Sequence, residues 1–237
     1  MKIAIIHDWL TGMRGGEKCL EVLCKLYPSA DIFTLLHIPG KVSPVIESHR
    51  IHTSFIQNLP FAESKYRYYL PLMPSAIEAF DLKEYDLILS SSHCVAKSVK
   101  PGPSSMHICY CHTPMRYIWD QFDQYFGKGK SSWFAATAIK FIRGWLQRWD
   151  VKTSRRVNHF IANSRHVQKR IKKYYNQEAA IIHPPVDTGL FTPDTNEKKE
   201  NYFLIVSAFA PYKRLDLAVN AFNQLNLPFF VIGEGQD

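Results

Sequence analysis

The sequence has no apolar run long enough to cross a membrane or to form the core of a secretion signal. Its first apolar stretch, which starts at Ile3, ends after four residues because His7 and Asp8 follow. A membrane-spanning helix needs about 20 apolar residues, and a signal core needs about 7 to 15. With 46% apolar residues among 237, the chain can bury a sizeable core. We therefore expect a soluble, globular, cytoplasmic protein.

Cysteine is scarce, and its five positions lack the spacing of a disulfide framework. We expect buried free thiols in a reducing compartment. Cys109 and Cys111 stand just before His112, which suggests zinc, but alternate residues of a strand share one face and no second ligand pair follows at zinc-finger spacing. The sequence therefore predicts no metal site and no cofactor.

Acidic residues are almost missing between Lys140 and Lys173. This stretch carries eleven Lys and Arg and one acid, Asp150, in a chain whose net charge is +8. Four of the five tryptophans lie between Pro114 and Asp150. Two interpretations stay open, namely peripheral docking on the anionic inner face of the plasma membrane, or a buried aromatic core beneath a solvated basic helix face. No zinc-finger, homeodomain or ribonucleoprotein signature is present, so no nucleic acid partner is expected.

Short apolar runs alternate with helical patterns along the chain. The pattern predicts helices over 15–26, 66–80 and 165–175, the last with Ser164 as its N-cap. Predicted strands lie at 2–6, 31–36, 85–89, 107–111, 158–163, 179–182, 203–206 and 229–232. Such alternation predicts an α/β protein with a Rossmann-like parallel sheet covered on both faces.

A polar stretch at residues 192–201 is the best candidate for a linker between domains. The alternation of strand and helix begins afresh beyond it. We predict one domain over 1–195, followed at 196–237 by the linker and the first β-α-β unit of an incomplete second Rossmann-like domain. Buried parallel strands need neighbours on both sides, which this second part lacks.

A glycine turn joins the first predicted strand to the first helix. Gly12, Gly15 and Gly16 lack the G-x-G-x-x-G spacing of dinucleotide-binding proteins. Bare amides at a helix start favour an anion, and phosphate is one interpretation. The other is that the glycines only permit a tight turn. A second glycine-lysine pair, at Gly129, is not a phosphate loop because Gln124 stands where that motif needs glycine.

The segment after the strand at 107–111 is the densest in reactive side chains. His112 follows the strand end, and Arg116, Tyr117 and Trp119 follow on predicted helical turns. Ligands of parallel sheets bind beyond the carboxyl ends of strands, so these residues are candidates to border a ligand-binding crevice. An imidazole there can bind a hydroxyl or move a proton. The alternative is a histidine that caps a hydrogen bond in the core.

Two further pairs of basic residues follow predicted strands. His93 and Lys97 are four apart, which predicts one helix face that contacts a bound ligand or lines the crevice wall. Lys213 and Arg214 open a helix after the strand at 203–206. Adjacent cations at a helix start oppose the helix dipole unless an anion lies there, which favours a phosphate partner. Glu17 is equally well explained as a first-turn surface charge.

Taken together, these segments resemble the N-terminal half of a family 4 glycosyltransferase of GT-B architecture, which has two facing Rossmann-like domains. The matching segments are Gly15-Gly-Glu-Lys18, Ser90-Ser-Ser-His93, Tyr110-Cys-His-Thr-Pro-Met-Arg-Tyr117, Phe160-Ile-Ala-Asn-Ser-Arg165, His183-Pro-Pro-Val-Asp187, Pro211-Tyr-Lys-Arg214 and Gly233-Glu-Gly235. The resemblance implies transfer of a sugar from a nucleotide-sugar to an acceptor, with retention of configuration and usually without metal. It also implies that the first domain receives the acceptor, so the acceptor-side candidates are His93, Lys97, Arg116, Tyr117 and Trp119.

The resemblance also implies roles for single residues. His112 matches the family's active-site histidine, Gly15 and Gly16 match its phosphate-side loop, and Lys213 matches the lysine that neutralises the departing diphosphate, with Arg214 beside it. Ala208 stands where many members carry an arginine. The acidic pair that grips the sugar and ribose is expected beyond residue 235.

The sequence thus predicts a hexosyltransferase, with mannose as one candidate sugar, that acts on a glycan or lipid-linked acceptor in cell-surface polysaccharide synthesis. This chain alone is expected to be inactive, because the acidic pair is not in it. The alternative is a non-catalytic domain that binds the acceptor or the membrane.

Overall fold

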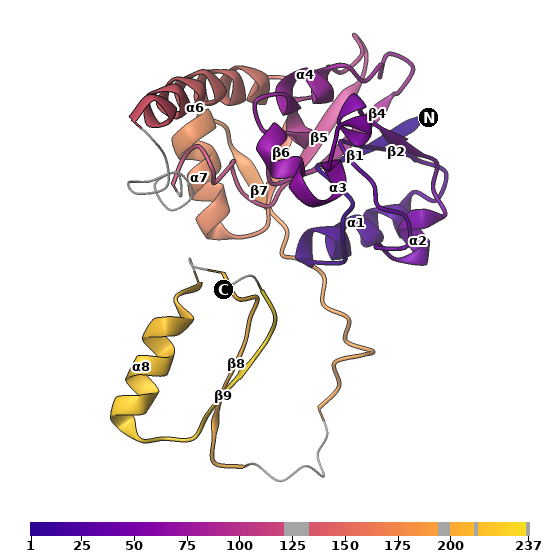
Figure 1. Cartoon of the computed structure of the whole chain (residues 1–237). Helices are drawn as coiled ribbons and strands as arrows, with labels where there is room; N and C mark the ends of the chain where they lie inside the picture. The colour runs from indigo at the N-terminus through magenta and orange to yellow at the C-terminus, as the bar shows by residue number, and fades with distance from the viewer. Residues whose placement is uncertain (121–132, 194–199, 211–212, 236–237) are drawn as a thin grey trace. The chain divides into compact units, whose positions relative to one another are not determined.

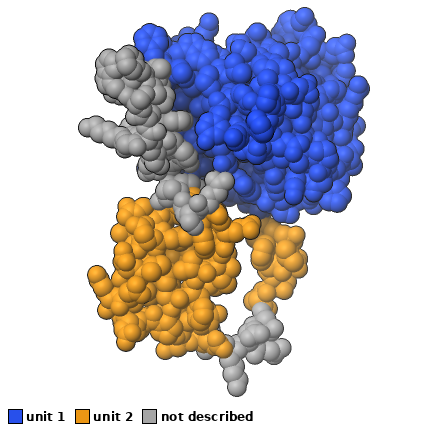
Figure 2. Space-filling view, viewed as in Figure 1, with its two compact units in different colours: residues 1–185 blue, residues 186–237 orange. Residues whose placement is uncertain are grey.

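The computed structural model describes residues 1–120, 133–193, 200–210 and 213–235. It contains two compact units, residues 1–185 and residues 186–237 (Figures 1 and 2). The predicted domain boundary at residue 195 stays a prediction, and most of the predicted linker, 194–199, lies outside the described residues. Gly129 and the loop around it also lie outside them.

Unit 1 is built on a seven-stranded parallel sheet, as the alternation of strands and helices predicted. The strand order is β3-β2-β1-β4-β5-β6-β7. The strands are β1 (Ile3–His7), β2 (Asp31–Thr34), β3 (Ile51–Thr53), β4 (Leu87–Ser92), β5 (Met106–Cys111), β6 (His159–Ala162) and β7 (Ala179–Ile181). All neighbouring strands pair in parallel. The central strands β1 and β4 are buried throughout, which is why each begins with a continuous apolar run, followed by His7 in β1 and by three serines in β4.

Helices cover both faces of this sheet (Figure 1). On one face, α1 (Gly15–Leu26) and α2 (Pro44–Glu47) pack on Ile3 and Ile5. On the other, α4 (Met73–Glu78) and α6 (Trp133–Ser154) pack on Ala4 and Ile6. Because successive strand residues point to opposite faces, β1 serves both cores. Helix α7 (Arg165–Tyr175) packs on β5 and β6, with Ser164 as its N-cap as predicted.

One helix and one strand differ from these predictions. The helix expected over 66–80 is interrupted, because Pro71 and Pro74 remove backbone donors. Within that range only a 3₁₀ turn (Tyr66–Tyr69) and α4 form, and the short helix α3 (Ala62–Lys65) lies just before it. The strand β3 went unpredicted because its three residues, Ile-His-Thr, form no apolar run at this sheet edge. The five cysteines are free and buried, as expected.

Unit 2 is one β-α-β unit, made of β8 (Phe203–Val206), α8 (Leu215–Leu225) and β9 (Phe229–Ile232), and it matches the predicted start of a second Rossmann-like domain. None of its described residues is fully buried. Gly233 and Gly235 follow β9, where an added Cβ would lie 1.8 Å from the Ser207 carbonyl oxygen and 2.1 Å from that of Phe209. These glycines therefore allow the two backbones to approach closely.

Candidate active site at the carboxyl edge of the sheet

The strand order of unit 1 reverses between β1 and β4, and three histidines gather at the carboxyl ends of the strands there. His7 ends β1, His93 follows β4 and His112 follows β5. The ring centroids of His7 and His93 are 6.1 Å apart, and those of His93 and His112 are 6.4 Å apart. Open parallel sheets bind ligands at such a reversal point. We call these three residues, with Asp8, Glu17 and Ser91, the histidine group.

Asp8 is fully buried and organises the turn that carries His93. Its carboxylate accepts hydrogen bonds from the backbone N–H groups of His93, Cys94, Val95 and Ala96, at 2.6 to 3.0 Å. Nδ1 of His93 lies 3.0 Å from Oδ2 of Asp8. Burial alone would raise the pKa of Asp8, but His93, His7 and the backbone amides together hold it below its ordinary value. Asp8 is therefore a buried anion with every lone pair occupied.

A second set of contacts joins Glu17 to His112. Oε1 of Glu17 lies 3.6 Å from Nε2 of His7, and Nδ1 of His7 lies 3.2 Å from Oγ of Ser91. The same Oγ lies 2.9 Å from Nε2 of His112. Nε2 of His7 is buried and has no hydrogen-bond partner among the described residues. Of the interpretations left open for Glu17, the surface charge does not hold, because Glu17 is 5% exposed.

His112 is half-buried at this edge. Burial, together with the neighbouring imidazoles of His7 and His93, lowers the pKa of His112 to about 3. Burial also lowers the pKa of His93, with Asp8 acting in the opposite direction. Both rings are therefore neutral imidazoles at neutral pH, and each carries one N–H and one bare nitrogen.

Gly15 and Gly16 are the first residues of α1 and border the histidine group. A Cβ on Gly16 would lie 3.6 Å from Cε1 of His7 and 3.8 Å from Nε2 of His112. Neither glycine has a positive φ, so a left-handed backbone does not explain them. What glycine leaves at residue 16 is space beside two imidazoles.

The segment after β5 is tied to its neighbours. The side-chain amide of Asn163 donates to the His112 carbonyl at 3.1 Å, and Arg116 and Tyr117 follow as half-buried residues. The charge of Arg116 contributes to the lowered pKa of His93, after burial and His7. The charge of Arg116 thus acts on one member of the histidine group, and its role on the acceptor side stays a prediction. In place of a helix, 116–120 forms a turn.

Lys97 requires a correction. It is 1% exposed, its short 3₁₀ helix (Ala96–Ser98) shares no helix face with His93, and its ammonium lies 2.7 Å from Oδ1 of Asp150. Trp119 and Tyr175 each donate a hydrogen bond to Oδ2 of the same carboxylate, at 2.9 Å. Lys97 therefore lies in the core and is not available to an acceptor. Trp119 also stacks on Tyr174 and is partly structural.

Lys213 and Arg214 lie in unit 2, before α8. Lys213 is exposed, and Arg214 adopts a left-handed conformation with φ of 50° and forms a bidentate ion pair with Asp216. The dipole argument for a phosphate at Arg214 is thereby weakened, because Asp216 in the first turn of α8 already supplies an anion.

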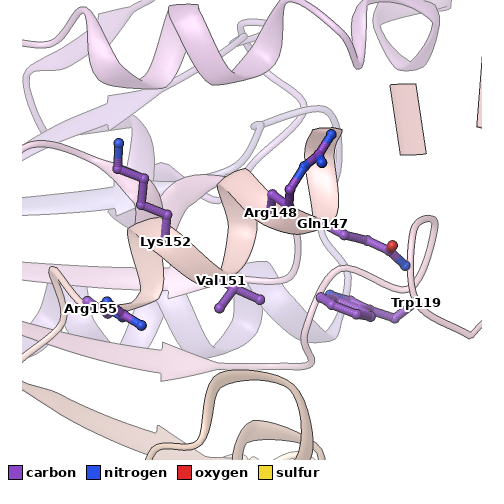
Figure 3. Close-up of a pocket in the computed structure, with 6 residues that line it drawn as sticks. All are labelled: Trp119, Gln147, Arg148, Val151, Lys152 and Arg155. Atoms are coloured by element: carbon purple, nitrogen blue, oxygen red, sulfur yellow. The ribbon is translucent and has the colours of Figure 1, made fainter. Parts of the chain in front are cut away.

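Figure 3 shows a shallow pocket of about 370 Å³, and none of its lining residues belongs to the histidine group. Its lining residues are Trp119, Gln147, Arg148, Val151, Lys152 and Arg155. Four of the six come from α6, Arg155 follows the end of that helix, and Trp119 comes from the segment after β5. Three cations beside an indole favour an anionic partner.

The fold and this edge define an α/β protein of Rossmann-like type with its candidate site at the reversal point of the sheet. The profile of Glycosyltransferase Family 4 matches residues 13–190. The chain belongs to this family.

Solved structures with the same fold are GT-B glycosyltransferases. Anabaena Alr3699/HepE in complex with UDP has a TM-score of 0.59 and 15% identity, covering 100% of this chain and 62% of that one. HepE in complex with UDP-glucose has a TM-score of 0.58 and 14% identity, and the match covers 98% of this chain and 60% of that one. The lipopolysaccharide outer core galactosyltransferase WaaB has a TM-score of 0.52 and 13% identity, and the match covers 100% of this chain and 62% of that one. No curated protein matches the sequence significantly. The chain thus spans about three fifths of the length of these structures.

Four members of the site were not predicted from the sequence as functional residues, namely His7, Asp8, Glu17 and Ser91. A signal for two of them was present, because His7 and Asp8 directly follow the first apolar strand and therefore lie at its carboxyl end. Their partners come from more than 80 residues away in the chain, which no local pattern indicates.

Proposed function

We propose that the chain is the acceptor-side part of a retaining hexosyltransferase. It would transfer a hexose, with mannose as one candidate, from a nucleotide-sugar to a glycan or lipid-linked acceptor in cell-surface polysaccharide synthesis, without a metal. The observation that carries this proposal is the neutral, half-buried imidazole of His112 beside Gly16 at the reversal point of the sheet. A neutral imidazole hydrogen-bonds to a sugar hydroxyl without adding a charge.

Two relatives in fold support a nucleotide-sugar donor and a surface glycan. HepE was solved with UDP and with UDP-glucose, and WaaB is a galactosyltransferase of the lipopolysaccharide outer core. In the proposed reaction, negative charge grows on the departing diphosphate as its bond to the sugar breaks. The amides of Gly15 and Gly16 at the start of α1, and the ammonium of Lys213, are the groups proposed to stabilise that charge.

Nucleotide binding tests the proposal on the chain as it is. When UDP or UDP-glucose is added to nitrogen-15-labelled protein, we expect the amide signals of Gly15, Gly16 and Lys213 to shift, with uridine as a control that lacks phosphate. Lys213→Ala is expected to weaken binding at least tenfold, because a charge-assisted contact is worth about 1.5 to 3 kcal/mol. The matched variant Lys25→Ala, at the far end of α1, should bind as the wild type does.

Failure of these signals to respond to any nucleoside diphosphate would overturn the proposed donor site. We further propose that these 237 residues alone do not turn over. Incubation with several nucleotide-sugars and a lipid-carrier acceptor is therefore expected to yield no product, and robust transfer would show that the donor site is complete within this chain.

A second candidate function, docking on an anionic membrane, is favoured by one face of α6. Exposed residues of α6 and of the turn that follows it recur at helical spacing, apolar first and then basic: Phe141, Trp145, Arg148 and Lys152 in α6, and Arg155 just after it. We call this set the α6 stripe. Aromatic and cationic side chains on one helix face suit the headgroup region of a bilayer. No helix in the described residues is long and apolar enough to span one.

Sedimentation with vesicles tests the α6 stripe. Replacement of Arg148, Lys152 and Arg155 by Gln is expected to lower the affinity for vesicles that contain anionic phospholipid at least tenfold, since each cation near such a surface contributes about 1 kcal/mol. The control replaces Lys25, Lys41 and Lys83, three exposed cations outside α6, and removes the same charge. Equal losses in both variants would mean that only net charge matters.

A further inference from the structure

Ser91 links the protonation of two histidines. Its Oγ lies within hydrogen-bond distance of Nδ1 of His7 and of Nε2 of His112. A hydroxyl has one proton, so it donates to one of these nitrogens and accepts from the N–H of the other. The tautomer of His7 therefore decides which nitrogen of His112 carries the proton.

Glu17 decides the tautomer of His7. Burial alone would raise the pKa of Glu17, but His7 holds it below its ordinary value, so Glu17 is an anion at neutral pH. Its Oε2 accepts a hydrogen bond from the Arg14 N–H at 3.0 Å, and this fixes Oε1 at 3.6 Å from Nε2 of His7. That distance exceeds a hydrogen bond, yet a negative charge so close in a buried site favours an N–H over a lone pair at Nε2.

The donor and the acceptor of each hydrogen bond from His7 through Ser91 to His112 follow from this. With its proton on Nε2, His7 has a bare Nδ1, and the Ser91 hydroxyl donates to it. Oγ of Ser91 then accepts from Nε2–H of His112. We propose that Glu17, His7 and Ser91 are positioning residues that fix His112 as the Nε2–H tautomer and leave its Nδ1 as a hydrogen-bond acceptor for a substrate hydroxyl.

Asp8 acts on His93 in a similar way. Its carboxylate at 3.0 Å takes the Nδ1–H of neutral His93 and leaves Nε2 bare. Among the described residues, no hydrogen bond to a side-chain group occupies Nδ1 of His112 or Nε2 of His93. Two bare imidazole nitrogens repel phosphate oxygens and accept from hydroxyls. The ligand class is therefore a hydroxyl-rich sugar, and its identity as acceptor or donor sugar rests on the proposed function.

The variant Glu17→Gln gives the sharpest test. Because the side-chain oxygen of Gln has to accept from the Arg14 N–H, its NH₂ group faces Nε2 of His7 and favours a bare nitrogen there. His7 then carries its proton on Nδ1 and donates to Ser91, and Ser91 donates to Nε2 of His112. We expect His112 to switch to the Nδ1–H tautomer. Long-range proton–nitrogen correlation spectra of labelled histidines, recorded in slightly alkaline solution, distinguish a protonated ring nitrogen from a bare one.

Ser91→Ala provides a second measurement that does not depend on α1. Loss of the hydroxyl is expected to move the ring nitrogen signals of His112 toward a mixture of the two tautomers. The matched control is Ser90→Ala, whose Oγ lies 2.8 Å from Nε2 of His107, and it should change His107 alone. A wild-type His112 protonated at Nδ1, or one unchanged by Ser91→Ala, would refute the inference. Because the samples for these spectra contain no nucleotide, the tautomer of His112 is tested independently of sugar transfer.

Discussion

Lys97→Met is expected to lower the free energy of unfolding by about 3 to 5 kcal/mol. The reason is that the fully buried carboxyl group of Asp150 would lose the ammonium 2.7 Å away and be left without its ion-pair partner. Since domains of this kind are stable by only about 5 to 15 kcal/mol, this variant loses a large part of the stability of unit 1. Urea unfolding monitored by tryptophan fluorescence measures the effect, because Trp119 contacts Asp150.

An exposed ion pair of the same length supplies the control. Nζ of Lys172 lies 2.7 Å from Oε1 of Glu178, and their side chains are 55% and 83% exposed. Solvent screens this pair, so Lys172→Met should cost less than about 1 kcal/mol. Equal losses in the two variants would mean that burial of the Lys97 pair contributes nothing, contrary to our expectation.

Asp8→Asn is expected to lower the free energy of unfolding by a similar amount, about 3 to 5 kcal/mol. The two oxygens of Asp8 accept four backbone N–H groups and face the His93 ring. Asn has one oxygen, and its NH₂ would face donors, so at least two buried N–H groups lose their acceptor. Chemical unfolding should show a lower midpoint, and the turn after β4 should exchange its amide hydrogens faster.

The acid dependence of this variant follows from the lowered pKa of Asp8 in the folded state. A carboxyl group whose folded pKa lies below its unfolded value of about 3.9 stabilises the fold fully above that value and loses this contribution as the pH falls through the folded pKa. The difference between wild type and Asp8→Asn should therefore shrink in acid. Asp86→Asn is the control, since Asp86 accepts the Lys2 N–H at an exposed site. An Asp8 variant as stable as that control would contradict the assigned role.

The elements that the sequence predicted well are those with local causes. The apolar run of β1, the glycine start of α1 at Gly15 and the Ser164 cap of α7 each lie within a few residues of the structure they produce. The helix at 66–80 was predicted wrongly because Pro71 and Pro74 outweigh an apolar pattern. The edge strand β3 carries no pattern at all.

By itself, the sequence determined the class of fold and the segments that resemble family 4 glycosyltransferases, since both depend on local order along the chain. It also placed His112 and Gly16 at the ends of their elements. Only the tertiary structure decided which polar groups meet. Lys97 and Asp150 are 53 residues apart, and Asp8 and His93 are 85 apart. These contacts depend on strand order and on which face each helix covers, and the spacing of residues does not encode either one.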